Sequence, residues 1–595
     1  MSAITPENLL TAWAQLLFDS LAAAGIERVI VSPGSRSTPF VVAAAKHPKL
    51  QLFNVIDERS AAFFAHGQAR ATGRPSLLVC TSGTAGAHYL PAVIEADQSG
   101  VPLVVMTADR PWELMHVGAN QTIDQRLLFE GYARRVIDLG APDPALSALH
   151  GLRRLAAQAV ALTLAPHPGA VHLNVRARKP LEPVTAQSPS GDVLAAAVRE
   201  LCGRPVPRAV EGKMALAADA VQMLADECLQ AKRGVIVAGP ASVAQAQARE
   251  AVAALQRASG FALLAEAASQ LRFLGEEVRC AASCDTFDWL YQLPHADEAW
   301  RPDLVIQLGA APTSGAWERF VDRHPTLRRI VIADWGWPDP HNTAAAVFHA
   351  DTGTACAQVA RALAKLRAAD VPRWGPLEKA DGEVRRLLND TVDAGGEALT
   401  EGTAVRMAVA SLPDDAWLVP GNSLPIRLVD AYCPGPQPRL RVVSQRGVSG
   451  IDGLIAGAAG VASVAHDPVL LLIGDVSFLH DIGSLAQAAL ARAPLIIVVL
   501  NNGGGRIFEQ LPIARTADES LMRHFTTPQG FDLQHAASLY RHGYVRVADG
   551  SALADALEHA RRAAGCTIID AIVAPHNVAE ESARIIGALK TMYGC

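Results

Sequence analysis

The chain has 595 residues, of which 50% are hydrophobic and 19% are charged, and its net charge is −6 at pH 7. A chain of this length is too long to fold around a single hydrophobic core and is predicted to form three or four domains. The apolar content excludes a disordered protein. The slightly acidic balance, without any cluster of Lys and Arg, excludes a nucleic-acid-binding class and favours small molecules or other copies of the chain as partners.

Several features predict the cytoplasm. The nine cysteines are scattered and form no Cys-x-x-Cys pair, which argues against a disulfide framework or a structural zinc site. The first residues lack the basic and apolar segments of a signal peptide and instead predict a helix capped by Thr5. The longest aliphatic runs, such as "LIIVVL", are far shorter than the roughly 18 residues of a membrane span. The sequence therefore predicts a soluble protein without a membrane span.

In chain order, short aliphatic runs alternate with Ala-rich helical stretches, which is typical of parallel sheets covered by helices on both faces. The runs expected as strands in the first third are 28–34, 50–58, 76–83, 102–110 and 169–175. A stretch rich in Pro and Ser at 178–192 is expected to be a linker. The middle third has such runs at 233–240, 261–267, 303–312 and 328–336, and the last third at 416–423, 441–447, 469–475, 495–502 and 566–573.

The predicted fold class is α/β, with three doubly wound parallel-sheet domains. Their predicted bounds are 1–185, 193–370 and 396–595.

Two neighbouring runs in the last third end in polar residues. Asp475 follows "VLLLIG", and Asn502 follows "LIIVVLN" before a glycine cluster, 27 positions later. This spacing allows one crossover helix and the next strand, so both oxygens are expected at the same edge of the sheet. A carboxylate, an amide oxygen and a glycine carbonyl are hard ligands that suit Mg²⁺ bound to phosphate. The alternative is that Asp475 only caps a helix and the glycines only form a turn.

Four arginines follow predicted strands in loops that carry Gly, Pro or Ser: Arg36, Arg110, Arg427 and Arg446. A guanidinium in such a loop offers a bidentate fork for a carboxylate. A single arginine of this kind is more often structural, but four together predict an unusually anionic substrate pair.

The motifs "GDVS" and "LNNGGG" resemble the metal-diphosphate motif of thiamine diphosphate (ThDP) enzymes. The motifs "SPGSRSTPF", "TADRPWEL", "GANQTIDQ", "GNSLPIR" and "RGVSGIDG" resemble, more narrowly, the MenD family of 2-succinyl-5-enolpyruvyl-6-hydroxy-3-cyclohexene-1-carboxylate synthases. The three predicted domains are similar to the pyrimidine-binding, central and diphosphate-binding domains of these enzymes.

The resemblance implies roles for individual residues. Glu58 would be the catalytic acid, buried against N1′ of the cofactor's aminopyrimidine. Gly474 and Ile451 would contact the cofactor, and Asp475, Asn502 and the Gly504 carbonyl would bind Mg²⁺, with Mn²⁺ as a possible substitute. The backbone of the Gly-rich stretch 446–457 would approach the cofactor. The residues that the resemblance assigns to the substrates are Ser35, Arg36, Arg110, Asn120, Gln121, Ser423, Arg427 and Arg446.

The implied reaction is the decarboxylation of 2-oxoglutarate and the addition of the remaining fragment to isochorismate, in menaquinone biosynthesis. The resemblance also implies a homodimer or homotetramer with active sites at the subunit interface. Two alternatives stay open. One is a ThDP carboligase of the acetolactate synthase type, and the other is a catalytically silent protein of the same fold that senses the cofactor.

Overall fold

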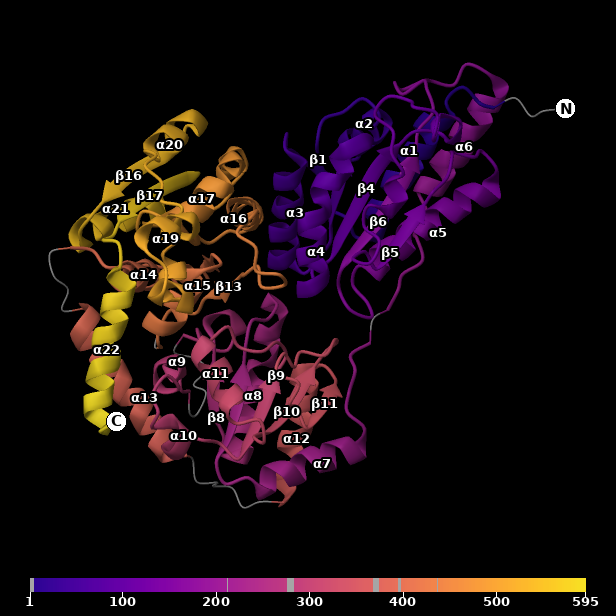
Figure 1. Ribbon diagram of the computed structural model, residues 1–595. Coiled ribbons are helices and arrows are strands. Elements are labelled where there is room, and N and C mark those ends of the chain that lie inside the picture. Colours follow the sequence, from indigo (N-terminus) through magenta and orange to yellow (C-terminus); the bar gives the residue numbers. More distant parts are fainter. Residues whose placement is uncertain (1–4, 211, 276–282, 367–373, 394–397, 436) are drawn as a thin grey trace. The chain divides into compact units, whose positions relative to one another are not determined.

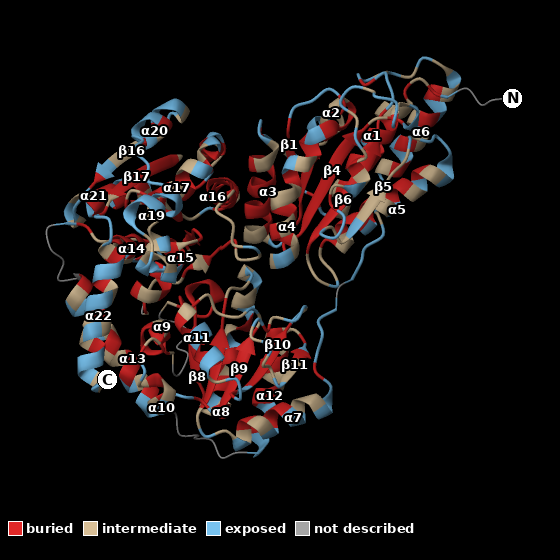
Figure 2. Cartoon of the chain, in the orientation of Figure 1, coloured by how far each residue is buried: buried red, intermediate tan, exposed pale blue. Residues whose placement is uncertain are grey.

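The computed structural model describes residues 5–210, 212–275, 283–366, 374–393, 398–435 and 437–595 (Figure 1). These residues form two compact units. Unit 1 comprises 1–211, 445–464 and 483–491, and unit 2 comprises 212–444, 465–482 and 492–595. Figure 2 shows that the strands are mostly buried, whereas the outer faces of the covering helices are exposed.

Unit 1 contains a sheet of six parallel strands in the order β2-β1-β3-β4-β6-β5. Its strands are β1 (Arg28–Val31), β2 (Gln51–Asn54), β3 (Ser76–Cys80), β4 (Leu103–Asp109), β5 (Arg135–Asp138) and β6 (Ala170–Arg176). Every residue of β3, β4 and β6 is buried, as expected for central strands that are covered on both faces.

Helices cover both faces of this sheet. One face packs against α1 (Leu9–Ala24), α2 (Thr38–Lys46), α5 (Leu146–Leu162) and α6 (Pro189–Cys202). The helix α3 (Glu58–Thr72) packs against β1, β3 and β4 and contacts two further helices, α4 (Leu90–Ser99) and α16 (Leu454–Ala462). The short helix α18 (Leu485–Ala488) contacts α16.

Unit 2 contains two further parallel sheets. The five-stranded sheet has the order β11-β10-β9-β7-β8, and the six-stranded sheet has the order β13-β12-β14-β15-β17-β16. The strands of the first are β7 (Gly234–Ala238), β8 (Ala262–Ala265), β9 (Leu304–Leu308), β10 (Arg328–Ala333) and β11 (Ala346–His349). Those of the second are β12 (Trp417–Pro420), β13 (Arg441–Val442), β14 (Val469–Gly474), β15 (Leu495–Asn501), β16 (Gly543–Val547) and β17 (Cys566–Ile572).

One face of the five-stranded sheet packs against α7 (Ala218–Gln230), α8 (Arg249–Ser259) and α12 (Thr352–Leu366). The core on its other face is continuous with that of the six-stranded sheet. The remaining helices of unit 2 are α9 (Phe287–Leu290), α10 (Ala296–Ala299), α11 (Gly315–Arg323), α13 (Gly375–Leu388), α14 (Glu401–Ala410), α15 (Leu424–Tyr432), α17 (Asp475–His480), α19 (Glu519–Thr526), α20 (Gln534–Tyr540), α21 (Gly550–Arg562) and α22 (Asn577–Tyr593).

The three parallel sheets confirm the predicted α/β class. Two local expectations differ from the structure. The helix α1 begins at Leu9 and not next to Thr5, because the Leu9 N–H is already engaged with the Pro6 carbonyl in a preceding turn. The end of the stretch predicted as a linker forms the start of α6, because Leu194, Val198 and Leu201 give that helix an apolar stripe that packs against α1.

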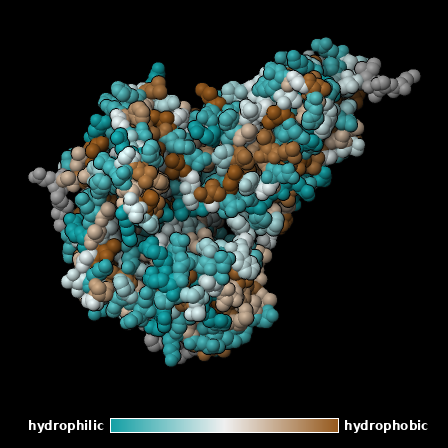
Figure 3. Space-filling model, viewed as in Figure 1, coloured by the Kyte–Doolittle hydropathy of each residue, from teal (hydrophilic) through white to brown (hydrophobic). Residues whose placement is uncertain are grey.

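On the face shown in Figure 3, hydrophilic and hydrophobic residues are interspersed over the surface. None of the described helices combines the length and the apolar character needed to cross a bilayer.

Burial in unit 2 predicts a pH-dependent stability. Glu266, which is fully buried, accepts a hydrogen bond from the Ser314 N–H, and its Oε2 has no partner among the described residues. The pKa of Glu266 is raised from 4.5 to about 8, mainly by burial and to a smaller extent by the nearby Asp430, although Arg272 acts in the opposite direction. The folded state therefore prefers the protonated acid. Its contribution to stability is complete below pH 4.5 and is lost as the pH rises through 8.

We therefore expect Glu266→Gln to gain stability relative to the unmodified protein between pH 5 and 8, by at most about 1.4 kcal/mol per pH unit. Glutamine keeps the acceptor for Ser314 but has no proton to lose. Urea denaturation of both proteins at pH 5 and at pH 8 measures the difference. The same difference at both values would show that Glu266 does not titrate in this range.

Candidate active site

The carboxyl ends of β14 and β15 meet at one edge of the C-terminal sheet. The two strands pair in parallel, with Gly474 opposite Leu500. Asp475 follows β14 as the first residue of α17, and Asn502 follows β15. Both residues line one cavity together with Gly504, as their spacing in the sequence predicts.

The polar groups in this cavity are buried. Asp475 is 4% exposed, and its Oδ1 accepts a hydrogen bond from the Val476 N–H at 2.9 Å. Burial raises the pKa of Asp475, although backbone N–H groups, including that of Gly504, favour the charged form. Asn502 is 5% exposed and donates from Nδ2 to Glu401 Oε1 at 2.8 Å. Its Oδ1 is buried and has no partner among the described residues.

These groups fit a hard, oxygen-liganded cation. A carboxylate and an unpartnered amide oxygen line the same cavity as the Gly504 backbone. Gly504 has φ +138°, and an added Cβ would lie 2.5 Å from the Thr526 carbonyl oxygen, so this position requires glycine. Within the described ranges, no three His, Cys, Asp or Glu side chains are placed to share a metal ion. A cation here would therefore depend on amide and backbone oxygens as well as on Asp475.

Glu401 also lines this cavity, and the sequence analysis did not identify it. It is the first residue of α14 and is 2% exposed. Its pKa is raised to about 7, mainly by burial and to a smaller extent by the negative charges of Glu581 and Asp475, although the hydrogen bond from Asn502 acts in the opposite direction. An acid in the first turn of a helix is common, so no local pattern distinguishes Glu401.

Ser423 lies in the same cavity, in a strained backbone conformation. It precedes α15 with φ +72°, which is unusual for a residue with a Cβ. Its carbonyl accepts a hydrogen bond from Arg427 Nη1 at 2.7 Å, and the Arg427 side chain is exposed. Gly474 lines the cavity too, and a Cβ added there would meet no atom within 4 Å. The structure thus brings Ser423 and Gly474 to the Asp475 cavity.

Glu58 lies in unit 1, as the first residue of α3. The resemblance implies a buried acid at this position, whereas Glu58 is half-buried in this chain. Its carboxylate has no hydrogen bond or ion pair within the described part of the chain. It lies close enough to the buried Cys80 and Tyr89 for its charge to raise their pKa values, in addition to the larger effect of burial.

Glycines of the Gly-rich stretch pack α16 closely against α3. A Cβ at Gly460 would lie 2.1 Å from the Phe64 carbonyl oxygen, and one at Gly453 would overlap the Phe63 ring. A Cβ at Gly67 of α3 would likewise lie 2.0 Å from the Gly457 carbonyl oxygen of α16. These glycines therefore serve helix packing. The cofactor contact that the resemblance implies for the stretch stays a prediction.

The loop before α16 carries Arg446 and Ile451, both half-buried. Glu95 of α4, which is 2% exposed, accepts the backbone N–H groups of Gly447 at 2.8 Å and Val448 at 2.7 Å. The buried carboxylate thus fixes the backbone next to Arg446.

Arg36 and Arg110 lie at the carboxyl edge of the sheet in unit 1. Arg36 is 4% exposed, its Nη1 donates to the Ala177 carbonyl at 2.7 Å, and its Nε has no partner in the described ranges. The Arg110 Nε is also buried without a partner. Neither guanidinium has an acid partner among the described residues, which leaves two cations available for anionic groups.

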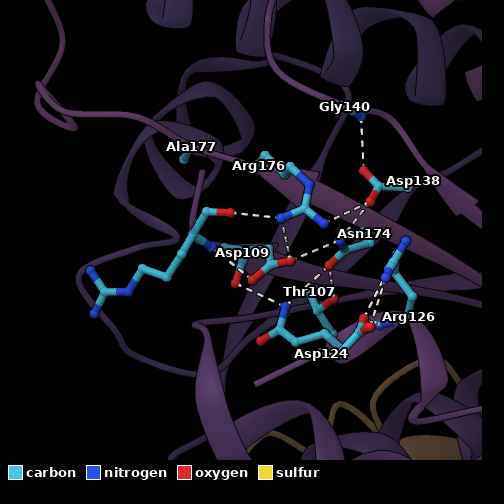
Figure 4. A network of polar contacts seen from close by, with 12 residues as sticks. Thr107, Asp109, Asp124, Arg126, Asp138, Gly140, Asn174, Arg176 and Ala177 are labelled. Atoms are coloured by element: carbon cyan, nitrogen blue, oxygen red, sulfur yellow. Dashed lines mark hydrogen bonds and ion pairs between the residues drawn. The ribbon is translucent and has the colours of Figure 1, made fainter. Parts of the chain in front are cut away.

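A buried polar network surrounds Arg176 (Figure 4) and fixes the backbone of Arg110. The fully buried Arg176 forms ion pairs with Asp109 at 3.1 Å and Asp138 at 2.9 Å. Its Nη1 also donates to the Arg110 carbonyl at 2.8 Å, while Asp109 accepts the Arg110 N–H at 2.7 Å. Asn174 donates to Asp109 at 2.9 Å. This network was not predicted from the sequence, because its members come from three strands, β4, β5 and β6.

The remaining predicted substrate residues of unit 1 are exposed: Ser35, Asn120 and Gln121. Gln121 has φ +55° and donates from Nε2 to the Ser82 carbonyl at 3.0 Å. The neighbouring Gln125, fully buried, accepts the Gly83 N–H at 3.0 Å and so ties the same loop to the end of β3.

Comparisons with known proteins agree with this arrangement. The family described as "Thiamine pyrophosphate enzyme, N-terminal TPP binding domain" matches residues 11–128, and "Thiamine pyrophosphate enzyme, C-terminal TPP binding domain" matches 431–571. A solved structure, the thiamine diphosphate-dependent 4-hydroxybenzoylformate decarboxylase of Rhodococcus jostii RHA1, has a TM-score of 0.68 at 18% identity. This match covers 95% of this chain and 99% of that chain, and it confirms the predicted fold.

Curated relatives carry the name 2-succinyl-5-enolpyruvyl-6-hydroxy-3-cyclohexene-1-carboxylate synthase. The relative from Sorangium cellulosum is 46% identical over 97% of this chain and 95% of its own length. Those from Myxococcus xanthus and Geobacillus kaustophilus are 38% and 39% identical, over 89% and 90% of both chains. The chain therefore belongs to the 2-succinyl-5-enolpyruvyl-6-hydroxy-3-cyclohexene-1-carboxylate synthase (MenD) family of thiamine diphosphate-dependent enzymes.

Proposed function

We propose that the chain decarboxylates 2-oxoglutarate and joins the remaining four-carbon fragment to isochorismate. Carbon dioxide leaves, and the new carbon–carbon bond gives 2-succinyl-5-enolpyruvyl-6-hydroxy-3-cyclohexene-1-carboxylate for menaquinone biosynthesis. The name of the curated relatives supports this product. The observation that carries the proposal is Arg36, a buried guanidinium without an acid partner among the described residues.

A buried cation is costly unless an anion or several hydrogen bonds compensate for its lost hydration. Arg36 keeps one carbonyl partner, and the backbone of Arg110 is fixed while its Nε remains unpartnered. Both proposed substrates are dicarboxylates, which supply the missing negative charge. We assign their carboxylates to Arg36, Arg110, Arg427 and Arg446, and their other polar groups to Ser35, Asn120, Gln121 and Ser423.

When bound, ThDP supplies the nucleophilic carbon and the electron sink for both steps. Asp475, the freely available Oδ1 of Asn502 and the Gly504 carbonyl would hold Mg²⁺ or Mn²⁺ beside its diphosphate. Gly474 would leave room for these groups, and Ile451 would support the cofactor from its apolar side. Glu58, whose carboxylate has no described partner, would hold the proton at N1′ of the aminopyrimidine.

We also propose a homodimer or homotetramer, in which the pyrimidine-binding domain of one chain meets the diphosphate-binding domain of another. The domain bounds remain those predicted, at 1–185, 193–370 and 396–595. We also propose a reducing cytoplasm as the compartment, because the nine cysteines are scattered along the sequence without a Cys-x-x-Cys pair.

The donor substrate provides the test of this proposal. A site that pairs a carboxylate leaves its cation unpaired when the carboxylate is missing, at a cost of about 2 to 5 kcal/mol. We therefore expect kcat/KM for 2-oxoglutarate to exceed that for pyruvate by roughly 30- to 4000-fold, measured at saturating isochorismate. Arg110→Ala should lower the value for 2-oxoglutarate or isochorismate, whereas the exposed Arg562→Ala, on α21, serves as the matched control.

Comparable values for the two donors would favour the acetolactate synthase type. The absence of any product, with ThDP bound, would favour a silent sensor.

A further inference from the structure

Glu401 lies next to Asn502, which is a candidate metal ligand. Neither the family resemblance nor the relatives assign a role to Glu401. We propose that Glu401 is a positioning residue, which fixes the Asn502 amide so that its Oδ1, and not its NH₂ group, faces the cation. This inference rests on the metal site proposed above.

The two ends of an amide side chain differ in their hydrogen-bonding chemistry. Asn502 presents one oxygen acceptor and one NH₂ donor, and rotation by half a turn about its last bond exchanges them. A carboxyl oxygen that accepts a hydrogen bond, such as Glu401 Oε1, pairs with the NH₂ end of the amide. The observed contact, from Nδ2 to Glu401 Oε1 at 2.8 Å, is of this kind. The oxygen end is consequently left buried in the cavity without a described partner.

The fold holds Glu401 firmly in this place. Its backbone N–H donates to Asn577 Oδ1 at 3.1 Å, at the start of α22. The preceding Thr400 caps α14 by accepting the Thr403 N–H at 3.0 Å. Glu401 is 2% exposed, so its side chain has little freedom to leave Asn502. A carboxylate anchored at a helix start thus selects one orientation of the amide.

Two other acids, Asp475 and Glu581, lie near Glu401, and one of them provides a control for its substitution. Asp475 lines the same cavity. Glu581, which is 3% exposed, accepts a hydrogen bond from Thr400 Oγ1 at 3.2 Å and has no hydrogen bond with Asn502 in the described part of the chain. Glu581 is therefore a matched control, because it is a buried glutamate of the same region. A variant at Glu581 disturbs the packing around α14 but leaves the Glu401–Asn502 hydrogen bond in place.

The test measures how strongly ThDP binding depends on Mg²⁺. ThDP affinity is determined by calorimetry over a series of Mg²⁺ concentrations, which gives the concentration required for half-maximal binding. We expect this concentration to rise about tenfold or more in Glu401→Ala, in line with the loss of one charge-assisted hydrogen bond. The Mg²⁺ concentration required by Glu401→Gln should lie between those of Glu401→Ala and the unmodified protein, because glutamine pairs with either end of the amide. Glu581→Gln should keep the value of the unmodified protein.

Three results would overturn the inference: an unchanged Mg²⁺ requirement in Glu401→Ala, equal losses in Glu401→Ala and Glu581→Gln, or a loss in Glu401→Gln as large as in Glu401→Ala. The last result would make Glu401 a direct ligand. If Glu401→Ala does not fold, as thermal unfolding would show, the comparison of the two glutamine variants decides. If ThDP binds the unmodified protein without Mg²⁺, the metal site itself is refuted, independently of Glu401.

Discussion

Glu58→Gln is expected to slow exchange of the C2 proton of bound ThDP by about 10²- to 10⁴-fold, the usual contribution of a general acid–base group. Glutamine has the size of glutamate and keeps one acceptor oxygen, but it cannot stabilise a proton at N1′. ThDP should still bind, because the metal and diphosphate contacts are made by other residues. The measurement is proton–deuterium exchange at C2, followed by quenching and NMR.

The matched control for this variant is Asp57→Ala. The Asp57 side chain caps α3 by accepting the Arg59 N–H at 2.9 Å. Its removal should cost about 1 kcal/mol of stability, but should leave the exchange rate unchanged. An exchange rate in Glu58→Gln equal to that of the unmodified protein would contradict the role proposed for Glu58.

Asp475→Ala is expected to weaken ThDP binding in the presence of Mg²⁺ by about 30-fold or more, which corresponds to about 2 kcal/mol. The carboxylate is the one negatively charged group among the three proposed ligands, so the cation loses its main electrostatic partner. Because burial raises the pKa of Asp475, its charge is unfavourable without a cation. The free energy of unfolding of the apoprotein should therefore not fall.

The control for Asp475 is Asp467→Ala. Asp467 precedes the opposite, amino end of the same strand, β14, and does not line the cavity. Calorimetry should give unchanged ThDP affinity for Asp467→Ala. An unchanged affinity in Asp475→Ala would remove Asp475 from the metal site.

The central strands of all three sheets were predicted from their aliphatic runs, whereas three strands were not predicted: β5, β11 and β16. Each of them lies at the edge of its sheet. An edge strand has one neighbour and is partly exposed, so its sequence does not need a continuous apolar run. The strand β16, "GYVRV", is mainly half-buried or exposed. Only its pairing with β17 defines it as a strand.

Glycine was informative in one place and ambiguous in another. At Gly504, close approach to the Thr526 carbonyl agrees with a tight loop after β15, which the cluster "NNGGG" predicts. In the stretch before and within α16, the same residue type allows contact between helices. Glycine indicates close approach of the backbone, but it does not indicate what approaches.

The sequence by itself determined that Asp475 and Asn502 lie together. Both follow buried runs separated by one crossover, and parallel pairing places the carboxyl ends of adjacent strands at one edge. The motifs likewise determined the family, because several of them agree in order and spacing.

Only the tertiary structure decided which groups complete the site. Glu401 meets Asn502 across 101 positions, and Arg36 meets the Ala177 carbonyl across 141. An acid in a helix's first turn, or an arginine after a strand, has the same local sequence whether it is exposed or buried. Burial and the absence of an opposite charge distinguish these side chains, and both depend on contacts between segments that are far apart in the chain.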